Sequence, residues 1–100
     1  MRKIEQQMNR AIAKRINWQS GNTRVAYDSD YDISSVYLHG HHIADYLHTG
    51  RYNRGEFAGP HANKETLRRW PTRLTKSRLR ALGINVTTKD RTTYIDGQPI

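Results

Sequence analysis

The feature that most limits the fold of this chain is a basic segment, residues 66–82, which a single proline interrupts. Proline has no backbone N–H and disfavours helical geometry in the residue before it, so Pro71 ends any helix that contains Trp70. Residues 72–82 then fit a short helix that starts from a threonine cap, and Gly83 stands where a left-handed C-terminal cap is wanted. The segment therefore predicts a helix held between Pro71 and Gly83.

The same segment concentrates positive charge. It contributes +6 and has no acidic residue between its first cation and Leu82, in a chain whose net charge is +8. At 100° per residue, a cluster of cations lies on the side of the helix away from its leucines, which predicts a cationic ridge on a buried scaffold. The six basic residues of the segment are Arg68, Arg69, Arg73, Lys76, Arg78 and Arg80.

Two interpretations of this ridge stay open at the level of sequence. Clustered arginines and lysines are the electrostatic footprint of a protein that contacts phosphates, and Trp70 can stack on a base or pack under the arginines. The alternative is the solvated face of an ordinary amphipathic helix. Because six like charges in one segment create a strong local field, we favour an anionic partner.

The N-terminal residues 1–17 form a second predicted helix. Apolar residues recur there at helical spacing, and Lys3, Arg10 and Lys14 fall opposite them on the helical wheel. A solubilising outer face explains these three cations equally well. If both basic helices lie on one side of a sheet, we expect their cations to form one surface.

The chain between the two helices reads as strands and loops. After a turn at residues 18–22, alternating apolar residues predict an antiparallel meander within residues 22–48. Residues 50–64 are rich in glycine and lack apolar periodicity, which predicts an exposed loop. Residues 84–97 predict a β-hairpin.

The predicted loop interleaves basic and aromatic residues. Arg51 and Arg54 alternate with Tyr52 and Phe57, a pattern that suits single-stranded nucleic acid, where bases stack on rings and arginines contact phosphates. A plain long loop that folds over the sheet accounts for the same residues.

These elements predict one α+β domain over residues 1–100. It contains the N-terminal helix, an antiparallel sheet of about five short strands, and the basic helix of residues 72–82 packed on the same sheet. A chain of 100 residues has room for one modest core and for no appended catalytic module.

Several classes of function find no support in the sequence. The chain has no cysteine, which excludes disulfides and thiolate metal sites. Four histidines lie close together (His39, His41, His42 and His48), but no metal-ligand spacing surrounds them, and no catalytic motif is present. We predict no metal, no cofactor and no enzymatic activity. The absence of an apolar run of membrane-spanning length and of an export signal predicts a soluble protein with no membrane partner.

Several short motifs carry a family resemblance. They are GNT at residues 21–23, VYLHG at residues 36–40, TKSRL at residues 75–79 with Ala81 and Leu82, and Tyr94 with the DG turn at residues 96–97. In these motifs the chain resembles a family of small proteins encoded by tailed bacteriophages. The resemblance implies a bacteriophage origin and an accessory role in the host bacterial cytoplasm. It assigns an activity to no residue.

The function predicted first is non-enzymatic, electrostatic binding of nucleic acid. The six cations of residues 66–82 contact phosphates together with Trp70, and Lys3, Arg10, Lys14, Arg51 and Arg54 extend the track. Little base specificity is expected, because no recognition motif is present.

Two other functions remain open. The first is a phage inhibitor that binds a host defence or transcription protein through an acidic or nucleic-acid-binding surface, with Trp70, Tyr52 and Phe57 as aromatic anchors. The second is a component of the virion or of the DNA-packaging apparatus.

Overall fold

A computed structural model describes residues 1–49 and 57–100 and confirms the α+β class. The elements, in chain order, are α1 (Lys3–Ala13), β1 (Trp18–Ser20), β2 (Thr23–Asp28), β3 (Ile33–Leu38), β4 (His41–Leu47), β5 (Gly59–Ala62), α2 (Lys64–Arg69), α3 (Arg73–Ala81), β6 (Val86–Lys89), β7 (Thr92–Ile95) and β8 (Gln98–Pro99).

Strands β1 to β5 form one antiparallel sheet in sequence order. The meander predicted for residues 22–48 corresponds to β2, β3 and β4. His39 and Gly40 join β3 to β4 with φ angles of 52° and 80°, the positive pair that a tight hairpin turn requires. One register shift between Val36 and Tyr37 interrupts the pairing of β3 with β4.

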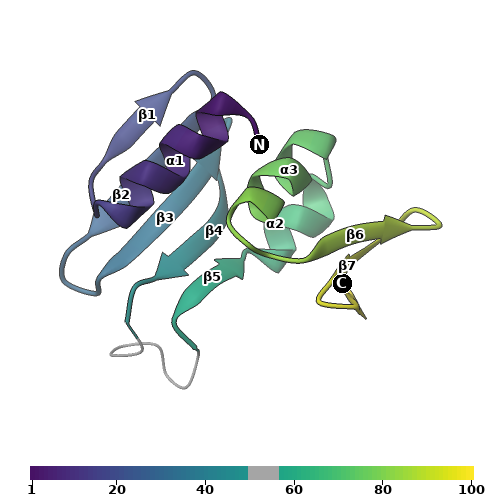
Figure 1. The fold of residues 1–100 in the computed structure, drawn as a ribbon. Helices are drawn as coiled ribbons and strands as arrows, with labels where there is room; N and C mark the ends of the chain where they lie inside the picture. The colour runs from purple at the N-terminus through teal and green to yellow at the C-terminus, as the bar shows by residue number, and fades with distance from the viewer. Residues whose placement is uncertain (50–56) are drawn as a thin grey trace.

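The helices lie on one face of this sheet (Figure 1). Helix α1 packs on β1 and β2, whereas α2 and α3 pack on β4. The alternation of strand residues sends every second side chain toward the helices, which makes a single core. Its largest fully buried apolar side chains are Met8, Val25, Val36, Ile43, Leu67, Leu79 and Val86.

The C-terminal hairpin does not extend the five-stranded sheet. Strands β6, β7 and β8 form a separate antiparallel sheet, and its β6–β7 hairpin projects away from the larger one (Figure 1). Gly83 ends α3 with a φ of 99°, and the N–H of Ile84 donates to the carbonyl of Leu79 (3.1 Å). This left-handed cap redirects the chain away from the five-stranded sheet.

Residues 1–22 differ from their prediction. The first helix ends at Ala13 and not at residue 17, because Arg15 adopts a φ of 54° and the N–H of Ile16 donates to the carbonyl of Ala11 (3.1 Å). The predicted turn at residues 18–22 begins instead with β1, an edge strand too short for its alternation to be read.

The prediction of a loop over residues 50–64 is wrong for residues 59–62. Gly59–Ala62 is the edge strand β5, which pairs with β4, and Pro60 is tolerated at such an edge. Residues 64–69, for which no helix was predicted, form α2 because the Asn63 side chain caps its N-terminus. Arg51, Arg54 and Tyr52 lie outside the described residues.

Candidate functional site

The basic segment folds as two short helices that meet at a corner. The Asn63 side chain accepts a hydrogen bond from the N–H of Thr66 (3.1 Å) at the start of α2, and Thr72 Oγ1 accepts one from the N–H of Thr75 (3.1 Å) at the start of α3. Pro71 separates the two helices, as predicted. Leu67 and Leu79 are buried in the core, so the opposite sides of both helices face outward.

Four of the six cations of the segment are exposed on these outward sides: Arg68, Arg69, Arg73 and Arg80. Lys76 is half-buried, and Trp70 at the corner keeps 44% of its surface exposed. Together these side chains form a surface that we call the basic ridge: Arg68, Arg69, Arg73, Lys76 and Arg80.

Two cations of the basic ridge are held by uncharged oxygen atoms of β6. The Lys76 ammonium donates to Thr88 Oγ1 (2.6 Å), and Arg80 Nε donates to the carbonyl of Val86 (2.8 Å). These bonds orient the two side chains without neutralising them. Within residues 1–49 and 57–100, the basic ridge has one ion pair, between Arg69 and Glu65 at 3.9 Å. Both side chains of that pair are largely exposed, so it compensates little charge.

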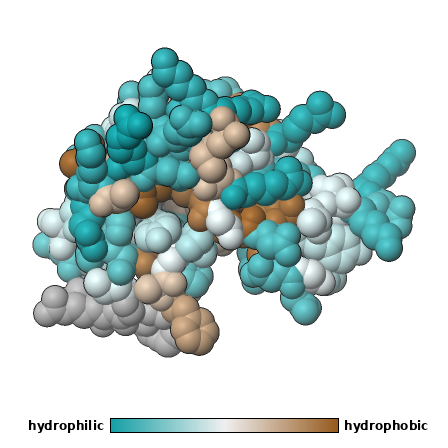
Figure 2. All heavy atoms as spheres, in the orientation of Figure 1, coloured by the Kyte–Doolittle hydropathy of each residue, from teal (hydrophilic) through white to brown (hydrophobic). Residues whose placement is uncertain are grey.

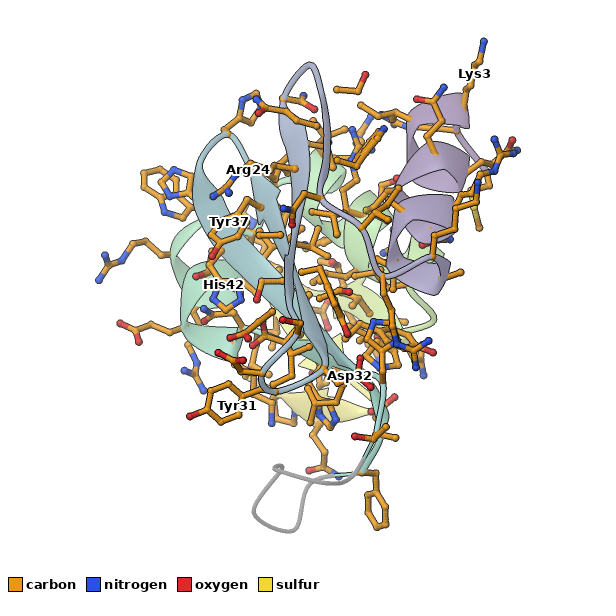
Figure 3. The ribbon with its side chains drawn as sticks, turned by 90° about the vertical axis from the view of Figure 1, so that its left-hand side faces the viewer. Lys3, Arg24, Tyr31, Asp32, Tyr37 and His42 are labelled. Carbon is orange, nitrogen blue, oxygen red and sulfur yellow. The ribbon has the colours of Figure 1, made fainter. Side chains whose placement is uncertain are left out.

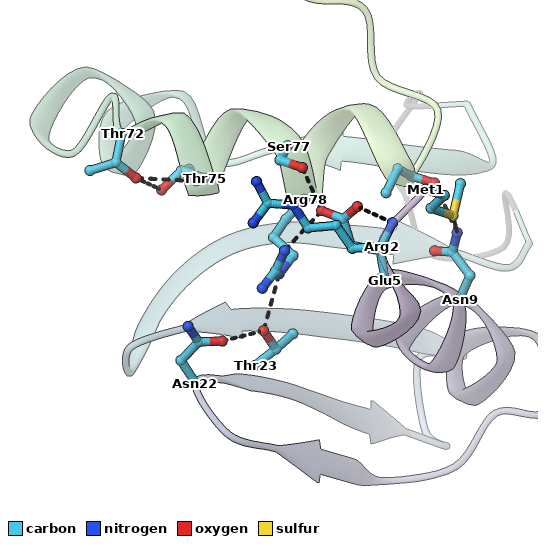
Figure 4. A network of polar contacts seen from close by, with 11 residues as sticks. Met1, Arg2, Glu5, Asn9, Asn22, Thr23, Thr72, Thr75, Ser77 and Arg78 are labelled. Carbon is cyan, nitrogen blue, oxygen red and sulfur yellow. Dashed lines mark hydrogen bonds and ion pairs between the residues drawn. The ribbon is translucent and has the colours of Figure 1, made fainter.

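Arg78 does not belong to this surface, which corrects the sequence prediction. Only 2% of its surface is exposed. Arg78 Nη1 donates to Glu5 Oε2 (2.8 Å), and Arg78 Nε donates to Thr23 Oγ1 (3.1 Å) (Figure 4). A buried guanidinium needs such partners, and they come from α1 and β2. Arg78 therefore joins three elements inside the protein and cannot contact phosphate.

The carboxylate of this pair is stabilised in its charged form. Ser77 Oγ donates to Glu5 Oε2 (2.6 Å), beside the bond from Arg78. Burial by itself would raise the pKa of Glu5, but the hydrogen bonds from Ser77 and Arg78 outweigh burial and lower that pKa.

The cations of α1 do not merge with the basic ridge. Lys3, Arg10 and Lys14 are exposed, and Arg10 and Lys14 line a groove that α1 forms with β1. The other side of α1 meets α3, where Asn9 Nδ2 donates to the carbonyl of Ala81 (2.9 Å). The basic ridge contacts β6 on the far side of α3. The two cationic groups thus lie on opposite flanks of the helix pair, and the expectation of one continuous surface is wrong.

The surface on the helix side reflects this division. Figure 2 shows hydrophilic side chains over α1 and over the β6–β7 hairpin, with hydrophobic patches between them. In Figure 3, Lys3 points away from the sheet at one end of α1.

The opposite face of the sheet carries a polar row that the sequence analysis missed. Arg24, Tyr37 and His42 are neighbours across β2, β3 and β4 and lie on the side away from α1 (Figure 3). The Arg24 guanidinium lies 4.1 Å from the centre of the Tyr37 ring, and His42 Nε2 lies 2.7 Å from Asp45 Oδ1. The period-two alternation of β2 and β3 was the available signal. Because Asp45 lies beside Arg24 and His42 on this face, the face lacks the excess of positive charge found on the basic ridge.

The histidines are dispersed among unrelated contacts. His42 pairs with Asp45, His41 stacks on Trp70, and His48 Nε2 lies 2.8 Å from Ser34 Oγ. Burial lowers the pKa of His48, which disfavours its charged form. Within residues 1–49 and 57–100, no three His, Asp or Glu side chains are grouped so that they could hold a metal ion.

These features define a small, basic α+β protein with two separate cationic surfaces. A family model described as Kyanoviridae Gp96 protein matches residues 1–100, and the chain therefore belongs to this bacteriophage family. The predicted resemblance to tailed-phage proteins is thus confirmed. No curated protein and no solved structure matches the chain. None of the helices in the described part of the chain is long and apolar enough to cross a membrane.

Proposed function

We propose that this phage protein binds nucleic acid electrostatically through the basic ridge, without enzymatic activity, in the cytoplasm of the host bacterium. The observation that carries the proposal is the way in which Lys76 and Arg80 are held. Their partners on β6 are a hydroxyl and a carbonyl oxygen, so both positive charges remain available to an anion. Exposed Arg73 lies on the same side of α3 and adds a third charge.

The geometry suits contacts with the phosphate backbone more than contacts with base edges. The cations lie along two short helices, and the side chains that would read bases in a groove form no recognised motif. Each phosphate neutralised contributes about −0.9 to the slope of log affinity against log salt on duplex DNA. Binding through Arg73, Lys76 and Arg80 alone therefore gives a slope of about −2.7.

Fluorescence anisotropy of labelled duplex DNA, single-stranded DNA and RNA at several salt concentrations tests this proposal. The ridge variant replaces Arg73, Lys76 and Arg80 by Gln, which removes three charges and keeps polar side chains beside β6. The matched control replaces Lys3, Arg10 and Lys14 by Gln and removes the same charge from the other flank. We expect micromolar, salt-sensitive binding by the wild-type protein, and a larger loss of affinity and of salt slope in the ridge variant than in the control.

Two results would count against the proposal. If the folded wild-type protein binds none of the three nucleic acids at moderate salt, nucleic-acid binding is wrong. If both triple variants lose affinity equally, binding follows net charge and the basic ridge is not the site. Far-UV circular dichroism of each variant shows whether the fold is retained.

An inhibitor that binds a host protein is the second candidate, and the exposed aromatic residues favour it. Phe57 is 84% exposed and Trp70 is 44% exposed, and such rings act as anchors in protein interfaces. A host protein that competes with nucleic acid for the basic ridge, and whose affinity depends on Phe57 and varies little with salt, would support this function. Self-association in solution would favour the virion or packaging role instead.

A further inference from the structure

Trp70 forms a ring pair with a residue of the sheet. It lies at the corner between α2 and α3, and its ring stacks on that of His41, the first residue of β4, with centroids 5.0 Å apart and an angle of 29° between the planes. Trp70 nevertheless keeps 44% of its surface exposed, and His41 is exposed as well. The ring pair is therefore accessible to a ligand.

A small hollow adjoins the two rings. Its volume is about 130 Å³, and its lining includes Trp70, His41, the hydroxyl-bearing Thr66 and Thr72, and the buried apolar Leu38 and Ile43. Pockets for drug-sized ligands run from roughly 300 to 1,000 Å³. This hollow is smaller, and its lining combines aromatic rings, apolar side chains and hydroxyl groups, which suits one planar heterocycle.

Exposed cations stand on both sides of Trp70 in the chain. Arg68 and Arg69 precede it at the end of α2, and Arg73 follows it at the start of α3. A planar group that stacks on Trp70 therefore has guanidinium groups nearby for the phosphates attached to it. In a duplex the bases are stacked on one another and do not present their faces, whereas a single strand presents them freely.

We infer that Trp70 and His41 form a stacking site for one unpaired base, and that the preferred ligand of the basic ridge is single-stranded nucleic acid. This inference rests on the proposed function and adds its substrate class. In the competing account, Trp70 only covers the corner between the two helices. In that case its ring would affect stability but would not distinguish single strands from duplexes.

The test compares a 12-nucleotide single strand with its duplex in anisotropy titrations of three proteins: wild type, Trp70→Phe and Trp70→Leu. Leucine keeps an apolar side chain but removes the ring, whereas phenylalanine keeps a smaller ring. We expect Trp70→Leu to weaken single-strand binding about 10- to 100-fold, which corresponds to ~1.4–2.8 kcal/mol of lost stacking. Trp70→Phe should lie between leucine and wild type, and duplex binding should change less than twofold in both.

A spectroscopic measurement on a protein with an intact site gives a second readout. The variant Trp18→Phe leaves Trp70 as the single tryptophan, and stacking of a base should quench its fluorescence when the single strand, but not the duplex, is added. His41→Ala should reduce this quenching by removing the second ring.

The outcomes separate this inference from the function on which it rests. If the wild-type protein binds nucleic acid in a salt-dependent way but Trp70→Leu binds single strands as tightly as wild type, the stacking site is refuted and the basic ridge remains. If Trp70→Leu weakens single-strand and duplex binding equally, the preference for single strands is refuted. If no nucleic acid binds at all, both proposals fail.

Discussion

The buried pair of Glu5 and Arg78 offers the sharpest test of the fold. We consider Arg78→Met, which keeps a long apolar side chain and removes the guanidinium. Its cavity term is therefore small, and the effect is mainly electrostatic. Glu5 is only 3% exposed. In the variant its carboxylate keeps the Ser77 hydroxyl as a donor but has no cation beside it.

The expected loss is large. Removing one partner of a buried ion pair typically costs about 3–5 kcal/mol, because the other charge stays buried and uncompensated. Whole domains of this size are stable by about 5–15 kcal/mol. Arg78→Met should therefore lower the free energy of unfolding by a substantial fraction, whereas a phosphate-contacting arginine on the surface would change it by less than about 0.5 kcal/mol.

The stability loss caused by Arg78→Met should also change with pH in a predictable direction. In the wild-type protein the pKa of Glu5 lies below its ordinary value of 4.5, so its contribution to stability is present above pH 4.5 and is lost as the pH falls through the lowered pKa. In Arg78→Met, loss of the cation should raise the pKa of Glu5 relative to the wild-type protein, and protonation then relieves the buried charge at a higher pH. The difference in stability between wild type and variant should therefore shrink as the pH falls from 7 toward 4.

Urea unfolding followed by far-UV circular dichroism at pH 7, 5.5 and 4 measures these differences. The double variant Glu5→Gln with Arg78→Met should be more stable at pH 7 than Arg78→Met alone, because no uncompensated charge stays buried. A loss below about 1 kcal/mol at pH 7 that does not vary with pH would refute the placement of Arg78 in the interior.

Two further predictions concern the ends of α3, with urea unfolding as the measurement for both. Thr72→Ala should lower the free energy of unfolding by about 1 kcal/mol, because the N–H of Thr75 loses its capping oxygen. Thr72→Ser keeps a hydroxyl and should be close to neutral. Equal losses in the two variants would exclude a capping role. Gly83→Ala should cost about 1–2 kcal/mol through its backbone conformation alone, since φ is 99° and an added Cβ would meet only Pro60 Cγ, at 4.0 Å. Gly83→Asn should cost less than Gly83→Ala, and the opposite order would contradict a left-handed cap.

Local sequence signals predicted the elements that depend on neighbouring residues. Pro71 and Gly83 set the limits of α3, and period-two alternation gave the meander of residues 22–48. Of the missed elements, α2 had a local signal in its Asn63 cap, whereas β1 and β5 depend on pairing with another strand. Strand β1 is three residues long and pairs with β2, and β5 contains a glycine and a proline but pairs with the free edge of β4. Strand pairing decides whether such short segments become strands, and their own residues carry little trace of it.

The sequence contained a partial signal that Arg78 is buried and does not belong to the basic ridge. On the helical wheel of α3, Arg78 falls between Leu74 and Leu82, on the apolar side. A cation in that position requires a buried carboxylate, but the sequence does not show which of its nine acidic residues is the partner. The answer, Glu5, is separated from Arg78 by 73 positions.

The sequence by itself determined the amount of positive charge, its concentration in residues 66–82, the α+β class and the corner at Pro71. The tertiary structure alone decided which cations face solvent and whether the two basic helices share a surface. Helical periodicity fixes the angles between side chains on one helix, but it does not fix how that helix is turned toward its neighbours. In this protein, Glu5 and Asn9 of α1 contact α3 and Leu79 enters the core. Arg78 is therefore inside, and the cations of α1 and of the basic ridge lie on opposite flanks.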